Sequence, residues 1–87
     1  MSFYVYLLLS KQNKKYISYV GYTSDLQKRL NLHNLSKGAK FTKGKKWKLI
    51  YSRTIKTKSL AMKEEYKLKK NYKLRKNIKN AYIKRNK

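Results

Sequence analysis

Several side chains suited to phosphate chemistry lie between Tyr19 and His33, a stretch of fifteen residues. It contains two tyrosine hydroxyls, Arg29 and the only histidine of the chain. A guanidinium can stabilise charge that develops on a phosphate, and a phenol or an imidazole can move a proton. Arg29 and His33 are four residues apart and share a face if the segment is helical. Because Asp25 stands four residues before Arg29, a surface ion pair is the alternative explanation of that arginine.

The beginning of the chain predicts a β-hairpin that carries two tyrosines of interest. Residues 3–9 are apolar on both faces, which is typical of a central or doubly covered strand. A polar break separates them from a second β-favouring run at residues 16–21. If the turn is centred between residues 12 and 13, paired residue numbers add to 25 and Tyr6 lies opposite Tyr19. Two tyrosines packed in the core are the alternative interpretation.

A turn and a helix are expected directly after the second strand. Gly21 ends the strand at a point where a side chain would obstruct the close approach of a backbone or a ligand. Thr23 or Ser24 can cap the next helix, and Ser24 with Gln27 has the spacing of a capping box. The helix that follows carries the arginine and the histidine on one face.

The second half of the chain predicts a basic loop, a third strand and two helices. Residues 35–46 form a loop punctuated by glycines, in which Phe41 could stack or anchor. Residues 47–51 alternate as a strand, residues 56–59 are suited to start a helix, and the helix runs through residues 60–70. A last helix is indicated by apolar residues at i, i+4, i+7 and i+8 from Leu74, before a basic tail at about residues 84–87.

Two adjacent carboxylates, Glu64 and Glu65, lie on the first of these two helices. On a helical wheel of about 100° per residue they flank its apolar side almost symmetrically. Periodicity therefore does not choose between them, and both could simply pair with the surrounding lysines.

The composition predicts one small domain with a polyanionic partner. A chain of 87 residues has room for a single hydrophobic core, so residues 1–87 are expected to form one domain. The net charge is +22, and residues 37–87 carry twenty Lys or Arg against two Glu. This excess favours nucleic acid over a membrane surface, because no lipidation signal or long apolar segment accompanies it. We therefore expect a cytoplasmic protein.

The absence of cysteine narrows the chemistry further. It excludes disulfides, thiolate nucleophiles and thiolate zinc sites, and a single histidine argues against structural zinc. A metal would be a hard ion such as Mg²⁺, bound through oxygen. A Gly-rich phosphate loop and paired aspartates are also absent. Metal-assisted hydrolysis of a phosphodiester is therefore predicted, and its candidate residues are Tyr6, Tyr19, Arg29, His33 and one of Glu64 and Glu65.

The order and spacing of these residues resemble the GIY-YIG nuclease family, specifically its small single-domain members. Residues 4–6, Tyr-Val-Tyr, stand for the first motif, with Tyr in place of Gly and Val in place of Ile. Residues 19–21, Tyr-Val-Gly, stand for the second. Arg29 falls eight residues after the motif glycine, and His33 follows four residues later.

Two further segments, residues 37–42 and 59–70, are also similar to the small members of the family. The resemblance covers roughly residues 3–74. A late asparagine of the larger members is not matched to any one position here, and the separate DNA-binding domains of those members have no counterpart in this sequence.

The resemblance implies an α/β fold with a three-stranded antiparallel sheet flanked by helices. It also selects Glu65 as the metal-binding carboxylate, because the family pattern of Glu followed four residues later by Lys fits Glu65 and Lys69.

The resemblance further implies a role for each remaining candidate. Tyr6, aided by His33, would position or deprotonate the attacking water. Arg29 would stabilise the transition state, and Tyr19 would orient the water or the phosphate.

Our leading hypothesis is an endonuclease that uses Mg²⁺ or Mn²⁺ to hydrolyse DNA and selects nucleic-acid structure rather than sequence. Backbone charge contacts would position the substrate. The residues expected to contact it are Lys37, Lys40, Phe41, Lys43, Lys45, Lys46 and Lys69. The alternatives are a non-catalytic basic nucleic-acid-binding module and an RNA- or ribosome-associated basic protein.

Overall fold

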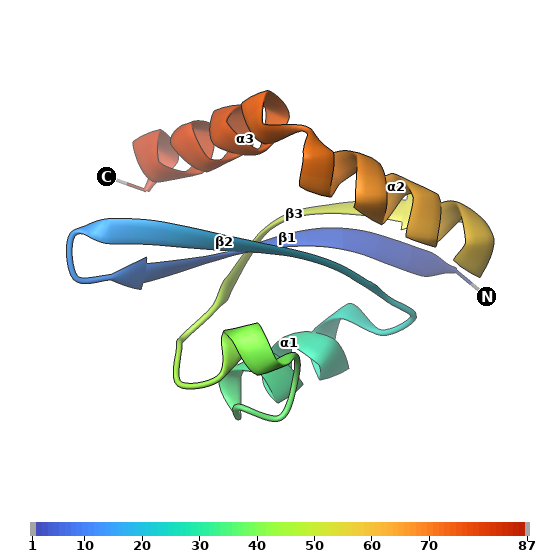
Figure 1. Cartoon of the computed structure of the whole chain (residues 1–87), viewed down its shortest axis with the longest axis horizontal. Helices are drawn as coiled ribbons and strands as arrows, with labels where there is room; N and C mark the ends of the chain where they lie inside the picture. The colour runs from blue at the N-terminus through green and yellow to red at the C-terminus, as the bar shows by residue number, and fades with distance from the viewer. Residues whose placement is uncertain (1, 87) are drawn as a thin grey trace.

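A three-stranded antiparallel sheet with helices on both faces forms the protein. The computed structural model describes residues 2–86. Its elements are β1 (Phe3–Gln12), β2 (Lys15–Thr23), α1 (Leu26–Asn34), the short 3₁₀ helix η1 (Lys40–Thr42), β3 (Lys48–Ile55), α2 (Lys58–Lys70) and α3 (Tyr72–Arg85). The strand order is β2-β1-β3. Helix α1 lies on one side of the sheet, and α2 and α3 lie on the other (Figure 1). The expected α/β fold is confirmed.

Strand β1 is the central strand, as its two apolar faces predicted. Residues 5–10 are all buried. Toward α2, Val5 and Leu7 belong to a core cluster with Ala61 and Leu68 of that helix. Toward α1, Tyr6 and Leu8 form a second cluster with Trp47. Alternate residues of one strand therefore face two different cores, and the polar hydroxyl of Tyr6 lies on the α1 side.

The register of the hairpin differs from the predicted one by two residues. Tyr6 pairs with Gly21, and Tyr19 pairs with Leu8, so that the expected Tyr6–Tyr19 pair is wrong. The turn is displaced because Asn13 adopts a left-handed conformation (φ 59°), which asparagine tolerates better than most residues. A slip of two residues preserves the face to which each side chain points. Tyr6 and Tyr19 therefore still share the α1 side of the sheet.

The N-cap of α1 lies one residue after Ser24, the later of the two expected caps. Asp25 is the N-cap, and its carboxylate accepts the backbone N–H of Lys28 (3.1 Å). The predicted cap at Thr23 or Ser24 is wrong. A carboxylate satisfies a free N–H of the first turn and also interacts favourably with the helix dipole.

Helix α3 is joined to α2 through one arginine and packs loosely on the sheet. The Arg75 guanidinium donates to the carbonyl oxygens of Leu68 and Lys69, each at 3.1 Å, at the end of α2. Ile78 packs against the first core cluster, but no residue of α3 is buried. The helix runs to Arg85 and so includes residues expected in the tail, whose residue 87 lies outside the described part of the chain. Within residues 2–86, no helix is both long and apolar enough to cross a bilayer.

Candidate active site

The hydroxyl of Tyr6 lies over Gly21 of the neighbouring strand. Tyr6 is 2% exposed. A Cβ atom on residue 21 would lie 2.5 Å from Cζ of Tyr6, which is closer than real Cβ contacts allow. Gly21 therefore makes room for the tyrosine. It does not end its strand as expected, since β2 continues to Thr23.

A chain of hydrogen bonds fixes the protonation of the imidazole beside Tyr6. Thr42 Oγ1 donates its single hydrogen to the carbonyl oxygen of Ala39 (2.7 Å). Toward His33 the same hydroxyl can only accept, so Nδ1 of His33 carries the ring proton (2.9 Å). In a neutral imidazole Nε2 must then be the acceptor, and the Tyr6 hydroxyl donates to it (2.9 Å). The phenolic proton of Tyr6 thus points at Nε2 of His33, which can act as its base.

Burial keeps this imidazole neutral. His33 and Thr42 are both 0% exposed. Burial lowers the pKa of His33 below its ordinary value of 6.5, and the positive charge of Arg29 lowers it further. At neutral pH, Nε2 is therefore free to accept a proton from Tyr6.

The pKa of Tyr6 is raised from its ordinary value of 10.0, chiefly by burial of the phenol. The neighbouring Arg29 guanidinium opposes this rise in pKa, whereas the charges of Tyr19 and Glu65 add to it. These effects place Arg29, Tyr19 and Glu65 within electrostatic reach of one hydroxyl. Tyr6 is a poor base if it must ionise alone, and it needs a partner that takes its proton.

Arg29 is available to the site because its expected partner is engaged elsewhere. The Asp25 carboxylate caps α1, and within residues 2–86 it forms no ion pair with Arg29. The alternative explanation of Arg29 as one half of a surface ion pair is therefore wrong. Arg29 is half-buried and lines a small recess together with Tyr6.

Tyr19 connects the imidazole to an aromatic cluster. Its ring centroid lies 5.2 Å from that of His33 in an edge-on arrangement. On another side it stacks with Phe41 (6.2 Å between centroids, 18° between planes) and lies 6.3 Å from Trp47. Tyr19 thus holds one side of the histidine and is half-buried rather than part of a closed core.

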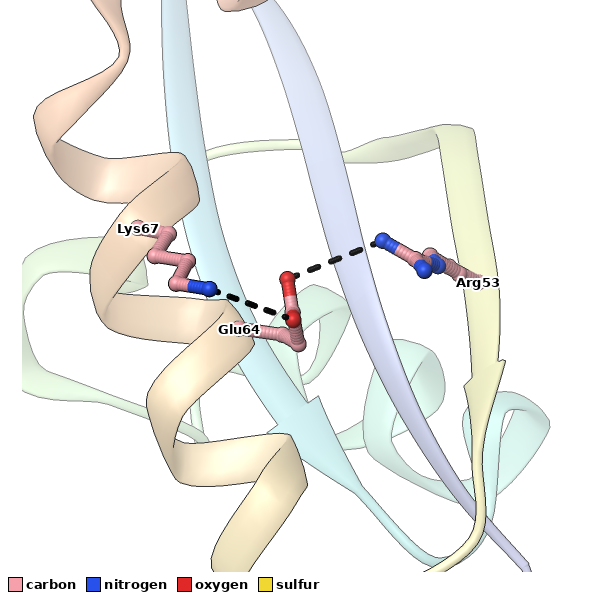
Figure 2. Close-up of polar contacts among 3 residues, drawn as sticks. All are labelled: Arg53, Glu64 and Lys67. Atoms are coloured by element: carbon pink, nitrogen blue, oxygen red, sulfur yellow. Dashed lines mark ion pairs between the residues drawn. The ribbon is translucent and has the colours of Figure 1, made fainter.

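The two adjacent glutamates have different partners. Glu64 extends across the sheet to Arg53 of β3 (3.6 Å) and also contacts Lys67 (3.8 Å), as Figure 2 shows. The Tyr6 hydroxyl lies instead over β2, at the opposite edge. Glu65 contacts only Lys69 (3.4 Å) among the ion pairs of residues 2–86. Glu65 is also the glutamate whose charge acts on the Tyr6 hydroxyl.

The donor set for a metal is a single carboxylate. In the described part of the chain, no three His, Cys, Asp or Glu side chains gather to hold an ion. Mg²⁺ is commonly held by one or two carboxylates, several waters and the phosphates of the substrate. Glu65 fits this type of binding, in which the nucleic acid supplies further ligands.

Comparison with known proteins now identifies the family. The family model of the GIY-YIG catalytic domain matches residues 2–80. The chain belongs to the GIY-YIG family. It is 43% identical over 67 residues to a UPF0213 protein of Bacillus velezensis, and the match covers 76% of this chain and 65% of that relative. It is 39% identical over 66 residues to a UPF0213 protein of Oceanobacillus iheyensis, covering 75% of this chain and 73% of the relative.

A solved structure is also similar to this GIY-YIG domain. It is the solution NMR structure of the UPF0213 protein BH0048 from Bacillus halodurans. The two chains are 31% identical and superpose with a TM-score of 0.48 over 94% of this chain and 85% of that one.

The residues expected to contact nucleic acid differ in their exposure and in their contacts. Phe41 is 52% exposed, and the Lys45 ammonium lies 5.2 Å from its ring centroid. Lys69 is paired with Glu65. The remaining four are exposed on the loop before β3: Lys37, Lys40, Lys43 and Lys46.

Sequence reasoning missed two residues of the site, Thr42 and Gly38. Thr42 accepts the Nδ1–H of His33 and so fixes the tautomer of the imidazole. A Cβ atom on residue 38 would lie 2.9 Å from Cε1 of His33, so only glycine lets the loop close over the imidazole. Both residues fall in the segment 37–42 that resembled the small family members.

Proposed function

We propose that this protein is a metal-dependent endonuclease that hydrolyses phosphodiester bonds in DNA and selects its substrate by structure. The observation that supports this best is the hydrogen-bond chain from Tyr6 through His33 to Thr42. In this chain the buried phenol of Tyr6 has a neutral base, His33, for its proton. The charges of Arg29 and Glu65 also act on the same phenol. Family membership alone suggests nuclease chemistry, whereas this chain of bonds supports it for these residues.

The proposed mechanism begins with water bound at the Tyr6 oxygen. Tyr6 accepts a proton from this water while its own proton passes to Nε2 of His33. The resulting hydroxide attacks phosphorus, the opposite P–O bond breaks, and the leaving oxygen takes a proton from solvent. His33 becomes an imidazolium whose Nδ1–H stays bonded to Thr42.

Charge on the phosphate is stabilised by Arg29, and Tyr19 holds the imidazole in place. A divalent ion on Glu65, Mg²⁺ or Mn²⁺, would supply a further positive charge at the phosphate. The exposed lysines of the loop before β3 bind the phosphate backbone without reading the bases, which agrees with a choice by structure.

Cleavage by matched glutamate variants tests the proposal. Purified wild-type protein is incubated with single strands, duplexes, flaps and junctions in Mg²⁺ and in EDTA. We expect cleavage of at least one substrate in Mg²⁺, and a loss of roughly 100-fold or more for Glu65→Ala and Arg29→Ala. Glu64→Ala is the control, because it removes an adjacent carboxylate that contacts Arg53 and Lys67 instead.

Equal cleavage by wild-type and Glu65→Ala protein would show that the activity belongs to a contaminant. The other possible outcome is that no substrate is cut but all of them bind, with an affinity that depends on salt and not on Mg²⁺ or Glu65. The protein would then be a non-catalytic nucleic-acid-binding module.

A further inference from the structure

A groove that does not include Tyr6 or His33 lies between α3 and the end of the sheet, and it extends to Asn34 of α1 and to Trp47. Its volume is about 800 Å³, and its lining includes Leu9 and Lys11 of β1, Tyr16 of β2, and Tyr82 and Ile83 of α3. We call it the α3 groove. The C-terminal half of α3 lies over the end of the hairpin here (Figure 1). Tyr6 and His33 do not line this groove, although Trp47, which does, packs in the same core cluster as Tyr6.

The groove exists because α3 is held to the rest of the protein mainly at its beginning. Arg75 fixes the first turns to α2, and Ile78 reaches the core. Beyond Ile78 the helix has no buried side chain to close the space beneath it. A recess of this size falls within the range of small-ligand sites, which is about 300–1,000 Å³.

The charged residues that line the α3 groove are all positive. Its rim carries Lys11, Lys46 and Lys48, and its lining contains no acidic residue. Within residues 2–86 none of these lysines pairs with a carboxylate, because Asp25 caps a helix and both glutamates pair elsewhere. Six further basic residues and no acidic one lie along α3. The groove therefore complements an anion.

Aromatic rings are the second feature of the α3 groove. Tyr16 is 36% exposed, and the Lys11 ammonium lies 5.9 Å from its ring centroid. Tyr82 is half-buried on the opposite wall. Rings bordered by cations suit a ligand that has both flat faces and phosphates. A base inside a duplex has its faces covered by its neighbours, whereas an unpaired base exposes them.

We propose that the α3 groove binds the unpaired bases of single-stranded nucleic acid, whose phosphates contact its lysines. The proposal rests on the proposed function in taking nucleic acid as the ligand, but it requires no cleavage. Trp47 lines the groove and also lies 6.3 Å from Tyr19 of the candidate active site. A strand held in the groove can therefore continue past Trp47 toward the bond to be cut.

Binding of two strands that differ only in their bases tests this proposal. A short single-stranded oligodeoxynucleotide is compared by fluorescence anisotropy, in EDTA, with an abasic strand of equal length and charge. We expect wild-type protein to prefer the strand with bases, and Tyr82→Ala to weaken its binding by roughly 5- to 100-fold, as expected for a lost base–aromatic stack. Tyr72→Ala is the matched control, since Tyr72 lies on the same helix outside the groove and is 64% exposed.

The lysine rim is tested by the double variant Lys11→Gln/Lys48→Gln, in which both substituted side chains are exposed. Loss of two phosphate contacts should reduce the salt dependence of single-strand binding by about 1.4 in log–log slope. Methyl NMR of the wild-type protein gives a readout independent of any variant. The Ile83 methyl signals should shift with the strand that has bases and not with the abasic strand.

Equal affinity for both strands, or equal effects of Tyr82→Ala and Tyr72→Ala, would overturn the groove proposal. Cleavage by the wild-type protein would then still support the nuclease. If base-dependent binding is found but no substrate is cut, the groove proposal stands and the proposed catalysis fails.

Discussion

Thr42 acts on the chemistry of Tyr6 only through the imidazole between them. We predict that Thr42→Val shifts the ring proton of His33 from Nδ1 toward Nε2, because valine offers Nδ1 no acceptor. Nε2 would then no longer accept the Tyr6 proton, and cleavage should fall by about tenfold or more. The measurement is ¹⁵N NMR of the imidazole, in which the only histidine of the chain gives a single pair of signals.

Thr42→Ser is the control for this prediction, because it retains the hydroxyl and should retain both the Nδ1–H tautomer and the activity. An unchanged tautomer in the valine variant would contradict the assignment. A purely structural role of Thr42 would lower stability in both variants without moving the nitrogen signals.

The buried imidazole also predicts how stability depends on pH. The pKa of His33 in the folded protein lies below its ordinary value of 6.5, so the unfolded chain binds this proton more readily. The contribution of the neutral His33 to the free energy of unfolding is therefore fully present above about pH 6.5. It is lost as the pH falls toward the lowered pKa of His33 in the folded protein. Urea unfolding at a series of pH values should show this loss. His33→Gln should remove the slope in that window, and an equal slope in the variant would refute the prediction.

The residues of the site could be predicted from the sequence to different extents. Arg29 and His33 were found because helix spacing places them on one face, a rule that operates within four residues. Thr42 comes nine residues after His33, at the end of η1, and no periodicity relates the two. Its position depends on Gly38, where a missing Cβ lets the loop close, and that requirement is visible only in three dimensions.

At the scale of elements, the hairpin positions Tyr6 through the register of β1 and β2. We predict that Gly21→Ala destabilises the protein by about 1–3 kcal/mol, because the new methyl group collides with the Tyr6 ring. Cleavage should fall as the phenol is displaced from His33. Tyr6→Leu tests whether this collision is the cause of the lost stability, since the smaller side chain makes room for the methyl group.

The double variant Tyr6→Leu/Gly21→Ala should therefore be more stable than the sum of the two single effects predicts, by about 0.5–3 kcal/mol. Equilibrium unfolding in urea measures all four proteins of this cycle. Additive effects would mean that residues 6 and 21 do not interact as the pairing of β1 with β2 indicates.

The strands and helices were largely predictable, whereas the strand register and the packing of α3 on the sheet were not. Alternation and helical periodicity gave three strands and the helices, because these rules follow from local geometry. The register was wrong by two residues, because it depends on whether the turn forms at Asn13 or one residue earlier. The α3 groove was also unforeseen, since the apolar spacing of residues 74–82 does not show how closely a helix approaches a sheet.

At the scale of the whole molecule, positive charge is the dominant feature. The net charge is +22, and residues 2–86 contain three ion pairs that engage only Glu64 and Glu65. The remaining cations repel one another in the compact state and are farther apart in the unfolded chain. The surface therefore favours polyanions at the cost of stability.

Salt should consequently stabilise this protein. We predict that the melting temperature rises as KCl is increased from about 0.05 to 0.5 M, because the Debye length shortens and the repulsion is screened. A gain of about 1 kcal/mol corresponds to about 4–8 °C for a domain of this size. Lys63→Gln, at an exposed position of α2, should raise the melting temperature at low salt and have little effect at high salt. A melting temperature that is independent of KCl, measured by circular dichroism, would show that the positive charges are too far apart to oppose folding.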